Sequence, residues 1–332
     1  MSAAKPGRSG KPGRSGKPGR SGKPGRSGKP GRSGKPVRSA QPGRAGRSGG
    51  PAKAGRGASP PGRSGSKGGP SRKGVTKRLG LGGDQVEGRQ AVRELLLAGA
   101  RKVREVVMAE DLDPSPILDD IRQLAREQRV TLSEVGRKAL ERQSHTESSQ
   151  GVVALAAEMQ PAELDDLARP AHGVAPFLLA LDSVTDPGNL GALLRTAECA
   201  GVSGVVLPRH RAAHLTPTVT KTAAGAIEHL PIALVGGLPS ALEQLRSEGV
   251  WVIGLDSAGA GSIYDLAVAD APICLVAGAE GKGLSPLVTR RCDEVVSLPL
   301  RGNLDSLNVA AAVAVAAYEV ARRRMAASDG AP

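Results

Sequence analysis

The sequence predicts an α/β protein: a C-terminal part built on a mostly parallel sheet, preceded by a small α/β domain and a basic N-terminal arm. After residue 175, apolar runs alternate with helical patterns along the chain. Most of these runs are continuously apolar, which is typical of parallel strands covered on both faces. The first 78 residues instead form a repetitive stretch rich in Gly and Pro.

The arm, residues 1–80, repeats Lys-Pro-Gly-Arg-Ser-Gly five times from Lys5 to Gly34. Residues 1–78 hold 22 of the 46 basic residues and no acidic one, so the rest of the chain has a formal net charge of −8. The repeat has no apolar side chain to bury, and Gly and Pro oppose helix and sheet. We expect a disordered polycation that attaches to a polyanion such as RNA; a merely solvated tail is the alternative.

A substrate-binding α/β domain is expected over residues 82–158. Helices are predicted from Gly88 to a capping Gly99, from the Ser115-Pro116 start signal, and over 134–142. Strands are predicted at 102–108, 130–132 and 151–157. The arginines of this domain either contact RNA phosphate or belong to ordinary exposed helix faces: Arg101, Arg104, Arg122, Arg126 and Arg129.

Residues 159–174 are expected to be a linker outside the core, because prolines flank three acidic residues there.

The second domain, 175–325, has strands predicted at 177–181, 202–207, 232–235, 250–255, 273–277 and 294–298. Its helices are predicted at 191–200, 218–227, 239–246 and from Ser306 to about Met325. Parallel sheets bind ligands beyond the carboxyl ends of their strands, so the loops there are the candidate site.

Composition excludes several classes of protein. There is no run of 18 apolar residues for a membrane span, and no apolar stretch follows the basic N-terminus as in a secretory signal. Three separated cysteines and five scattered histidines favour a reducing cytoplasm over a metal site. The four aromatic residues are too few for a base-stacking surface. P-loop, dinucleotide-binding and serine-hydrolase signatures do not fit the predicted elements.

Three loops after predicted strands combine glycine with polar side chains. The first contains Asn189, Gly191, Arg195 and Thr196; the second is Gly278-Ala-Glu-Gly-Lys-Gly283; the third runs from Leu298-Pro299 to Ser306-Leu-Asn-Val309. Together they resemble the motifs of the SpoU family of RNA ribose 2′-O-methyltransferases, which are TrmH-like members of the trefoil-knotted SPOUT superfamily. Ala310 stands where that family commonly has serine.

The resemblance implies a knotted domain that binds S-adenosyl-L-methionine and acts as a homodimer. The first domain also resembles the substrate-binding domain of bacterial enzymes that methylate a guanosine of large-subunit ribosomal RNA, down to Gln150-Gly-Val-Val-Ala154. The implied partner is therefore ribosomal RNA, with no membrane and no metal. Transfer RNA, a ribosomal adenosine whose methylation gives antibiotic resistance, and a non-catalytic RNA-binding role are the alternatives.

The resemblance also assigns site residues. It implies cofactor contacts at Gly278, Leu298 and Leu307, with Ser306 and Asn308 beside them, although Ser306 could instead cap the last helix. Arg195 matches the catalytic arginine, yet a guanidinium stays protonated. We therefore expect Arg195 to hold phosphate and stabilise alkoxide charge, unless it forms only a salt bridge with Glu198.

Five further polar residues belong to the same regions of the sequence. Asn189 is expected to bind ribose, to orient Arg195 or simply to cap a helix, and Glu280 to bind substrate or the arginine. For Lys221, Glu228 and His229 we expect packing of the knot or of the dimer interface, not chemistry.

Deleting residues 1–78 tests the role of the arm. If about five to eight of its charges contact phosphates, the log–log salt dependence of RNA binding should flatten by roughly four to seven units. Cofactor affinity and folding stability should not change, because the arm adds binding and no transition-state contact. An unchanged salt slope in filter-binding titrations would leave the solvated tail as the interpretation.

Overall fold

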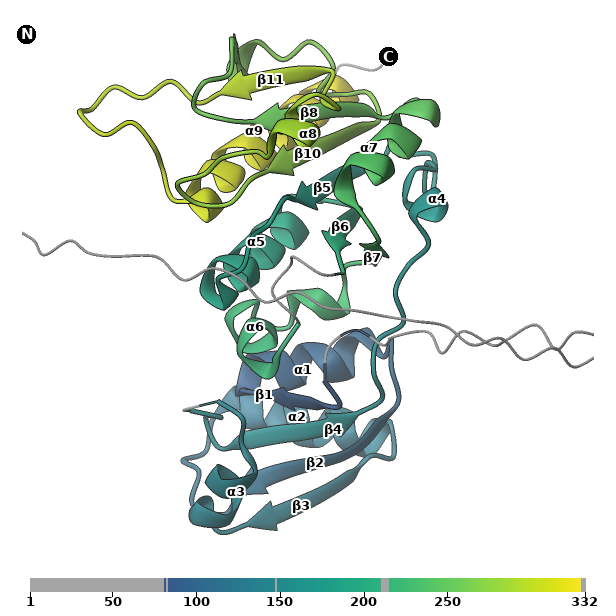
Figure 1. Cartoon of the computed structure of the whole chain (residues 1–332). Helices are drawn as coiled ribbons and strands as arrows, with labels where there is room; N and C mark the ends of the chain where they lie inside the picture. Colours follow the sequence, from purple (N-terminus) through teal and green to yellow (C-terminus); the bar gives the residue numbers. More distant parts are fainter. Residues whose placement is uncertain (1–80, 82, 147, 210–214, 330–332) are drawn as a thin grey trace, which may run out of the picture. The chain divides into compact units, whose positions relative to one another are not determined.

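The computed structural model describes residues 81, 83–146, 148–209 and 215–329, with elements labelled in Figure 1. These residues all belong to one compact unit, Arg72–Pro332. The arm predicted over residues 1–80 lies outside the described residues. Among the described residues, no helix has the length and apolar character needed to cross a membrane.

The first domain is a four-stranded sheet with helices on both faces. Its elements are β1 (Gln85–Glu87), α1 (Arg89–Ala98), β2 (Val103–Ala109), α2 (Pro116–Glu127), β3 (Thr131–Val135), α3 (Arg137–Gln143) and β4 (Val152–Ala156). The strand order is β1-β4-β2-β3, in which only β2 and β3 run parallel. Helices α1 and α2 pack in one apolar cluster and α3 in another.

The helices expected in this domain are present, whereas β3 continues to Val135 beyond the predicted 130–132 and β1 was not predicted. Gly99 adopts φ 58° at the end of α1, and Pro116 opens α2, as expected. The helix predicted at 134–142 begins only at Arg137, because Val135 still pairs with Ala109 at the end of the parallel β2–β3 ladder.

The segment predicted to be a linker contributes to the core. Helix α4 (Leu164–Leu167) follows the first domain, and Leu167 and Ala168 are buried in an apolar cluster with α7 (Leu238–Ser247). A Cβ at Gly204 of β6 would lie 2.8 Å from the Leu167 side chain, so a glycine there makes room for it. The expectation that this segment lies outside the core is therefore wrong.

The second domain contains a seven-stranded sheet in which every pair of neighbours is parallel. Its strands are β5 (Phe177–Leu181), β6 (Gly204–Pro208), β7 (Ile232–Val235), β8 (Trp251–Leu255), β9 (Gly261–Ser262), β10 (Ile273–Ala277) and β11 (Glu294–Ser297). The spatial order is β7-β6-β5-β10-β8-β11-β9. The short β9 at the edge was not predicted.

Both faces of this sheet are covered, as the continuously apolar strands predicted. Phe177, Leu179 and Leu181 of β5 lie in one cluster, whereas Leu178 and Ala180 lie in the other. The first cluster includes α5 (Pro187–Cys199), α6 (Pro217–Thr222), the 3-10 helices η1 (Ala226–Glu228) and η2 (Ile263–Asp265), and α9 (Val309–Asp329). The second includes α4, α7 and α8 (Pro286–Thr289).

Three predicted helices have different boundaries. Helix α5 starts at Pro187, before the predicted 191, because Asp186 Oδ2 accepts a 2.6 Å hydrogen bond from the Asn189 backbone N–H. The helix predicted at 218–227 breaks after Thr222, where Ala224 and Gly225 take φ of 52° and 87°.

The last helix, predicted from Ser306, begins at Val309. Its cap is Asn308, whose Oδ1 accepts from the Ala310 N–H at 2.9 Å, and not Ser306.

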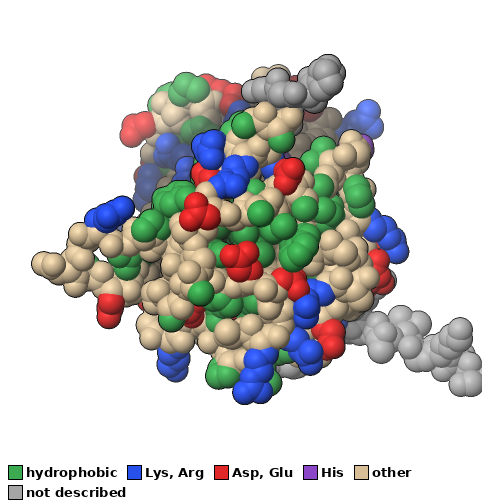
Figure 2. Space-filling model, turned by 90° about the horizontal axis from the view of Figure 1, so that it is seen from above, with side chains coloured by type: hydrophobic (Ala, Val, Ile, Leu, Met, Phe, Trp, Pro, Cys, Tyr) green, Lys and Arg blue, Asp and Glu red, His purple; other side chains and the backbone are tan. Residues whose placement is uncertain are grey.

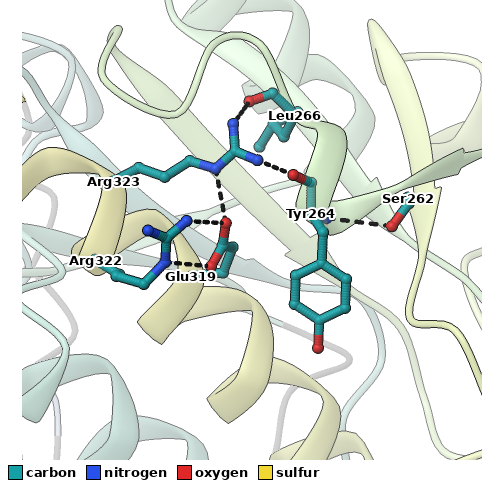
Figure 3. Close-up of polar contacts among 6 residues, drawn as sticks. All are labelled: Ser262, Tyr264, Leu266, Glu319, Arg322 and Arg323. Atoms are coloured by element: carbon teal, nitrogen blue, oxygen red, sulfur yellow. Dashed lines mark hydrogen bonds and ion pairs between the residues drawn. The ribbon is translucent and has the colours of Figure 1, made fainter. Parts of the chain in front are cut away.

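The C-terminal part of α9 is fixed to the loop around η2 (Figure 3). Arg322 and Arg323 both donate hydrogen bonds to the Glu319 carboxylate, which lowers its pKa to about 2. Arg323 also donates to the carbonyl of Leu266 at 2.7 Å and to that of Tyr264. Arg323 and Arg324, the latter bound to the Pro176 and Ala271 carbonyls, thus attach the end of this helix to neighbouring segments.

Candidate functional site

A cavity of about 480 Å³ lies at the carboxyl ends of β8, β10 and β11. Leu255, Ala277 and Val296 of these strands line it, and Val309 and Val313 of α9 close one side. Its volume is within the range of small-molecule sites, and its position is where parallel sheets bind ligands. The cavity is therefore the candidate site.

The loop after β10 forms one wall and requires glycine. A Cβ on Gly278 would lie 2.1 Å from the carbonyl oxygen of Gly283, closer than any side chain allows. Gly283 itself has φ 61° and pairs with Ala279 in an isolated bridge. The turn thus folds back on itself and presents backbone groups to the cavity.

Two carboxylates hold this loop from neighbouring strands. Asp182, which follows β5 and is buried, accepts from the Ser285 N–H at 2.7 Å. Asp256, which follows β8 and lines the cavity, accepts from the Leu284 N–H at 3.2 Å. Neither residue was predicted to have a role; the available signal in the sequence was an acidic residue directly after an apolar strand.

Hydrogen bonds join all three sequence motifs through their polar side chains. Asn189 Nδ2, in the first turn of α5, donates to Glu280 Oε2 at 2.8 Å. Asn308 Nδ2 donates to Asn189 Oδ1 at 2.9 Å. Because Asn308 also caps α9, this chain fixes the starts of two helices against the loop after β10. The expected helix-capping role of Asn189 belongs to Asp186 instead.

Arg195 projects from α5 as an exposed side chain. Within the described part of the chain it has no ion-pair or hydrogen-bond partner, so the alternative of a salt bridge with Glu198 is not observed. The Cys199 thiol, one turn further on, has a pKa raised by burial and then by Glu198.

The site residues suggested by the sequence fall into two groups. Five line the cavity: Gly278, Glu280, Leu298, Ser306 and Leu307. The other three, Asn189, Asn308 and Arg195, do not. Backbone groups of a glycine turn beside leucine side chains suit an adenosine-sized, partly apolar ligand. No cluster of His, Cys, Asp and Glu that could hold a metal occurs among the described residues.

Comparison with known proteins matches both domains to families. Residues 176–318 match the SpoU rRNA methylase family, and residues 85–162 match the RNA 2′-O ribose methyltransferase substrate binding family. The TrmH family protein YacO of Bacillus subtilis is 41% identical over 243 residues, 73% of this chain and 96% of that protein. The 23S rRNA (guanosine-2′-O-)-methyltransferase RlmB of Pseudomonas syringae is 38% identical over 247 residues, again 73% of this chain and 97% of that protein.

A solved structure has the same fold. The SpoU methyltransferase AviRb from Streptomyces viridochromogenes, solved in complex with its cofactor AdoMet, superposes with a TM-score of 0.61 at 25% sequence identity. The match covers 73% of this chain and 90% of that one.

Replacing Gly278 tests the folded-back turn. We expect Gly278→Ala to lower the free energy of unfolding by about 1–3 kcal/mol, because its Cβ would collide with backbone rather than with a movable side chain. Thermal unfolding measures this loss. The matched control is Gly302→Ala, where a Cβ meets nothing within 4 Å; equal effects of the two substitutions would contradict the close approach.

Proposed function

Because the chain belongs to the SpoU rRNA methylase family, we propose that it methylates the ribose 2′-hydroxyl of a guanosine in large-subunit ribosomal RNA. The family makes the chain an RNA 2′-O-methyltransferase that uses S-adenosyl-L-methionine. One observation carries the assignment of its site: the Glu280–Asn189–Asn308 chain joins the family motifs beside the cavity. The guanosine target is supported by the similarity to RlmB.

The cavity residues fit the cofactor, which supplies an electrophilic methyl group when bound. Backbone groups of the loop at Gly278 and the side chains of Leu298 and Leu307 would hold it. The reaction needs the ribose oxygen in line with the methyl group, so the main task of the site is to hold the cofactor and the ribose in that alignment. Ser306 stands beside Leu307 in the same wall.

Polar residues at the same edge of the sheet would serve the RNA. Arg195 binds the phosphate next to the target ribose and stabilises negative charge on the attacking oxygen. Asn189 and Glu280 position the ribose through their shared hydrogen bond, and Asn308 keeps the Asn189 amide in one orientation. This division agrees with the exposure of Arg195 to solvent.

A homodimer is the proposed assembly. Helix α9 exposes an apolar stripe in the single chain: Val315 is 40%, Tyr318 51% and Met325 60% exposed. These residues recur at the spacing of one helix face, together with the exposed Ala311; the exposed Arg322 interrupts this face between Tyr318 and Met325. Covering this stripe with a second copy would remove it from water.

A ribosomal RNA substrate would place the enzyme in the cytoplasm, consistent with three free cysteines.

Beyond residue 78 the chain has a formal net charge of −8, so its overall charge does not attract RNA. On the face shown in Figure 2, Lys and Arg side chains are interspersed with Asp and Glu, and hydrophobic side chains gather toward the middle. Of the side chains described on that face, the basic ones form no continuous surface. RNA attraction at long range is thus assigned to the arm, and specific contacts to the substrate-binding domain.

Purified protein should methylate a ribose and not a base. After incubation of ribosomal RNA with labelled S-adenosyl-L-methionine, digestion should release an alkali-resistant dinucleotide that contains guanosine. Transfer RNA and ribosomal RNA are compared under the same conditions. A labelled base, or preference for transfer RNA, would contradict the proposal.

Arg195→Ala should lower turnover by roughly two orders of magnitude, as expected for loss of one transition-state charge stabiliser. Cofactor affinity, measured by calorimetry, should stay within about twofold because Arg195 does not line the cavity. Glu198→Ala is the matched control on the same helix and should remain active. If Arg195→Lys keeps most activity, the planar fork of arginine is not required.

Sedimentation at micromolar concentration should report a dimer. Tyr318→Glu would place a charge in the centre of the α9 stripe and should shift the protein toward monomer, because a carboxylate there would have to be removed from water on association. Leu287→Glu, at another exposed apolar position, serves as the control. A wild-type monomer would refute the assembly.

A further inference from the structure

The segment 221–229 has no part in the site described so far, yet it contacts the substrate-binding domain. It comprises the end of α6, a turn at Ala224 and Gly225, and η1. Helix α1 of the first domain contacts both α6 and η1, and β1 contacts α6. Packing within the second domain or against a second copy was expected for Glu228 and His229; both side chains instead bond to the first domain.

A buried ion pair is the centre of this contact. Arg101, two residues before β2, donates from Nε to Glu228 Oε2 at 2.9 Å and from Nη2 to Oε1 at 2.6 Å. The side chains are 4% and 0% exposed, respectively. Arg101 Nη1 also donates to the Ala157 carbonyl at 3.2 Å, so the guanidinium is bound within its own domain as well. Arg101 is therefore unavailable to bind RNA phosphate, which was one of the two alternatives that its sequence context suggested.

Two neighbouring contacts fix the same surfaces. His229 Nε2 lies 3.0 Å from Glu94 Oε2 of α1. Gly225, with φ 87°, approaches α1 so closely that a Cβ there would lie 2.5 Å from the Glu94 Cβ. The close approach at Gly225 and the two parallel hydrogen bonds of the Arg101–Glu228 pair each form only in one orientation. Together they therefore define one relative position of the two surfaces.

The same segment packs against the helix that carries the candidate catalytic residues. A Cβ on Gly191 of α5 would lie 2.5 Å from the Thr222 Cβ at the end of α6. Helix η1 also contacts α5, and its Ile227 is fully buried in the larger core. Gly191 lies between Asn189 and Arg195 in α5. The segment is thus held on one side by α5 and on the other by Arg101.

We propose that the Arg101–Glu228 pair is a docking joint: it fixes the substrate-binding domain against the catalytic domain and so sets which ribose of the bound RNA reaches Arg195. The part of this inference that concerns RNA rests on the proposed function. A buried ion pair adds little net stability compared with apolar side chains, but loss of one partner leaves an uncompensated charge that is costly to keep buried. Separation of the two surfaces would return that charge to water.

The test compares three variants of the full chain. Glu228→Leu leaves the Arg101 guanidinium without its carboxylate. The double variant Arg101→Leu, Glu228→Leu removes both charges. The matched control, Asp84→Asn, removes the partner of Arg104 in an exposed ion pair within the first domain. Should Glu228→Leu fail to fold, Arg101→Lys keeps the charge without the bidentate fork and is judged by the same criteria.

Two measurements are expected to respond. In Glu228→Leu, amide hydrogen exchange should rise in α1 and η1 while β5 and β10 stay protected, because only the joint opens. The KM for ribosomal RNA should rise about tenfold or more and methylation should spread to neighbouring riboses, whereas kcat and cofactor affinity stay within about twofold. The double variant should return to within about threefold of wild-type KM, and Asp84→Asn should match wild type.

Normal exchange and normal KM in folded Glu228→Leu would overturn the joint. A double variant as impaired as Glu228→Leu would also overturn it, since the defect would then not come from the unpaired Arg101 charge. Failure of the wild type to methylate ribosomal RNA would refute the proposed function, while the exchange comparison would still decide whether the joint exists.

Discussion

The shape of the cavity depends on two carboxylates that hold one loop. Asp182 and Asp256 end strands on either side of β10 and accept the N–H groups of Ser285 and Leu284. Between β10 and these anchors the chain must turn within a few residues, which is why Gly278 meets the Gly283 carbonyl so closely. The cofactor wall, the Glu280 side chain and its bond to Asn189 all follow from that turn.

Sequence patterns predicted the strands of the large sheet well because strands buried on both faces are continuously apolar. The same patterns missed helix starts that depend on one polar side chain: Asp186 begins α5 earlier than periodicity indicates, and Asn308, not Ser306, caps α9. The prediction that the last domain is knotted rests on the family resemblance. Local pattern carries no information about threading.

Local sequence patterns could not predict contacts between residues that are far apart in the sequence. Arg101 and Glu228 are 127 positions apart, and each by itself resembles an ordinary surface charge. Leu167 was likewise hidden among acidic residues and prolines, although it fills space left by Gly204. By contrast, the site motifs could be recognised because each is contiguous in the chain, and the parallel sheet then brings them to one edge.

The spatial order of the strands also constrains how the chain can be synthesised and folded. Strand β10 pairs with both β5 and β8, so it forms the centre of the sheet although it is made after both. As the chain leaves the ribosome, β5, β6 and β7 can pair with one another, but β8 cannot join them until β10 (Ile273–Ala277) has been synthesised. Until then the edges of β5 and β8 that pair with β10 have no hydrogen-bond partner. Non-local parallel pairing of this kind is slow, and unpaired edges are prone to aggregation. Nascent chains truncated before β10 would therefore be natural clients of chaperones that cover strand edges.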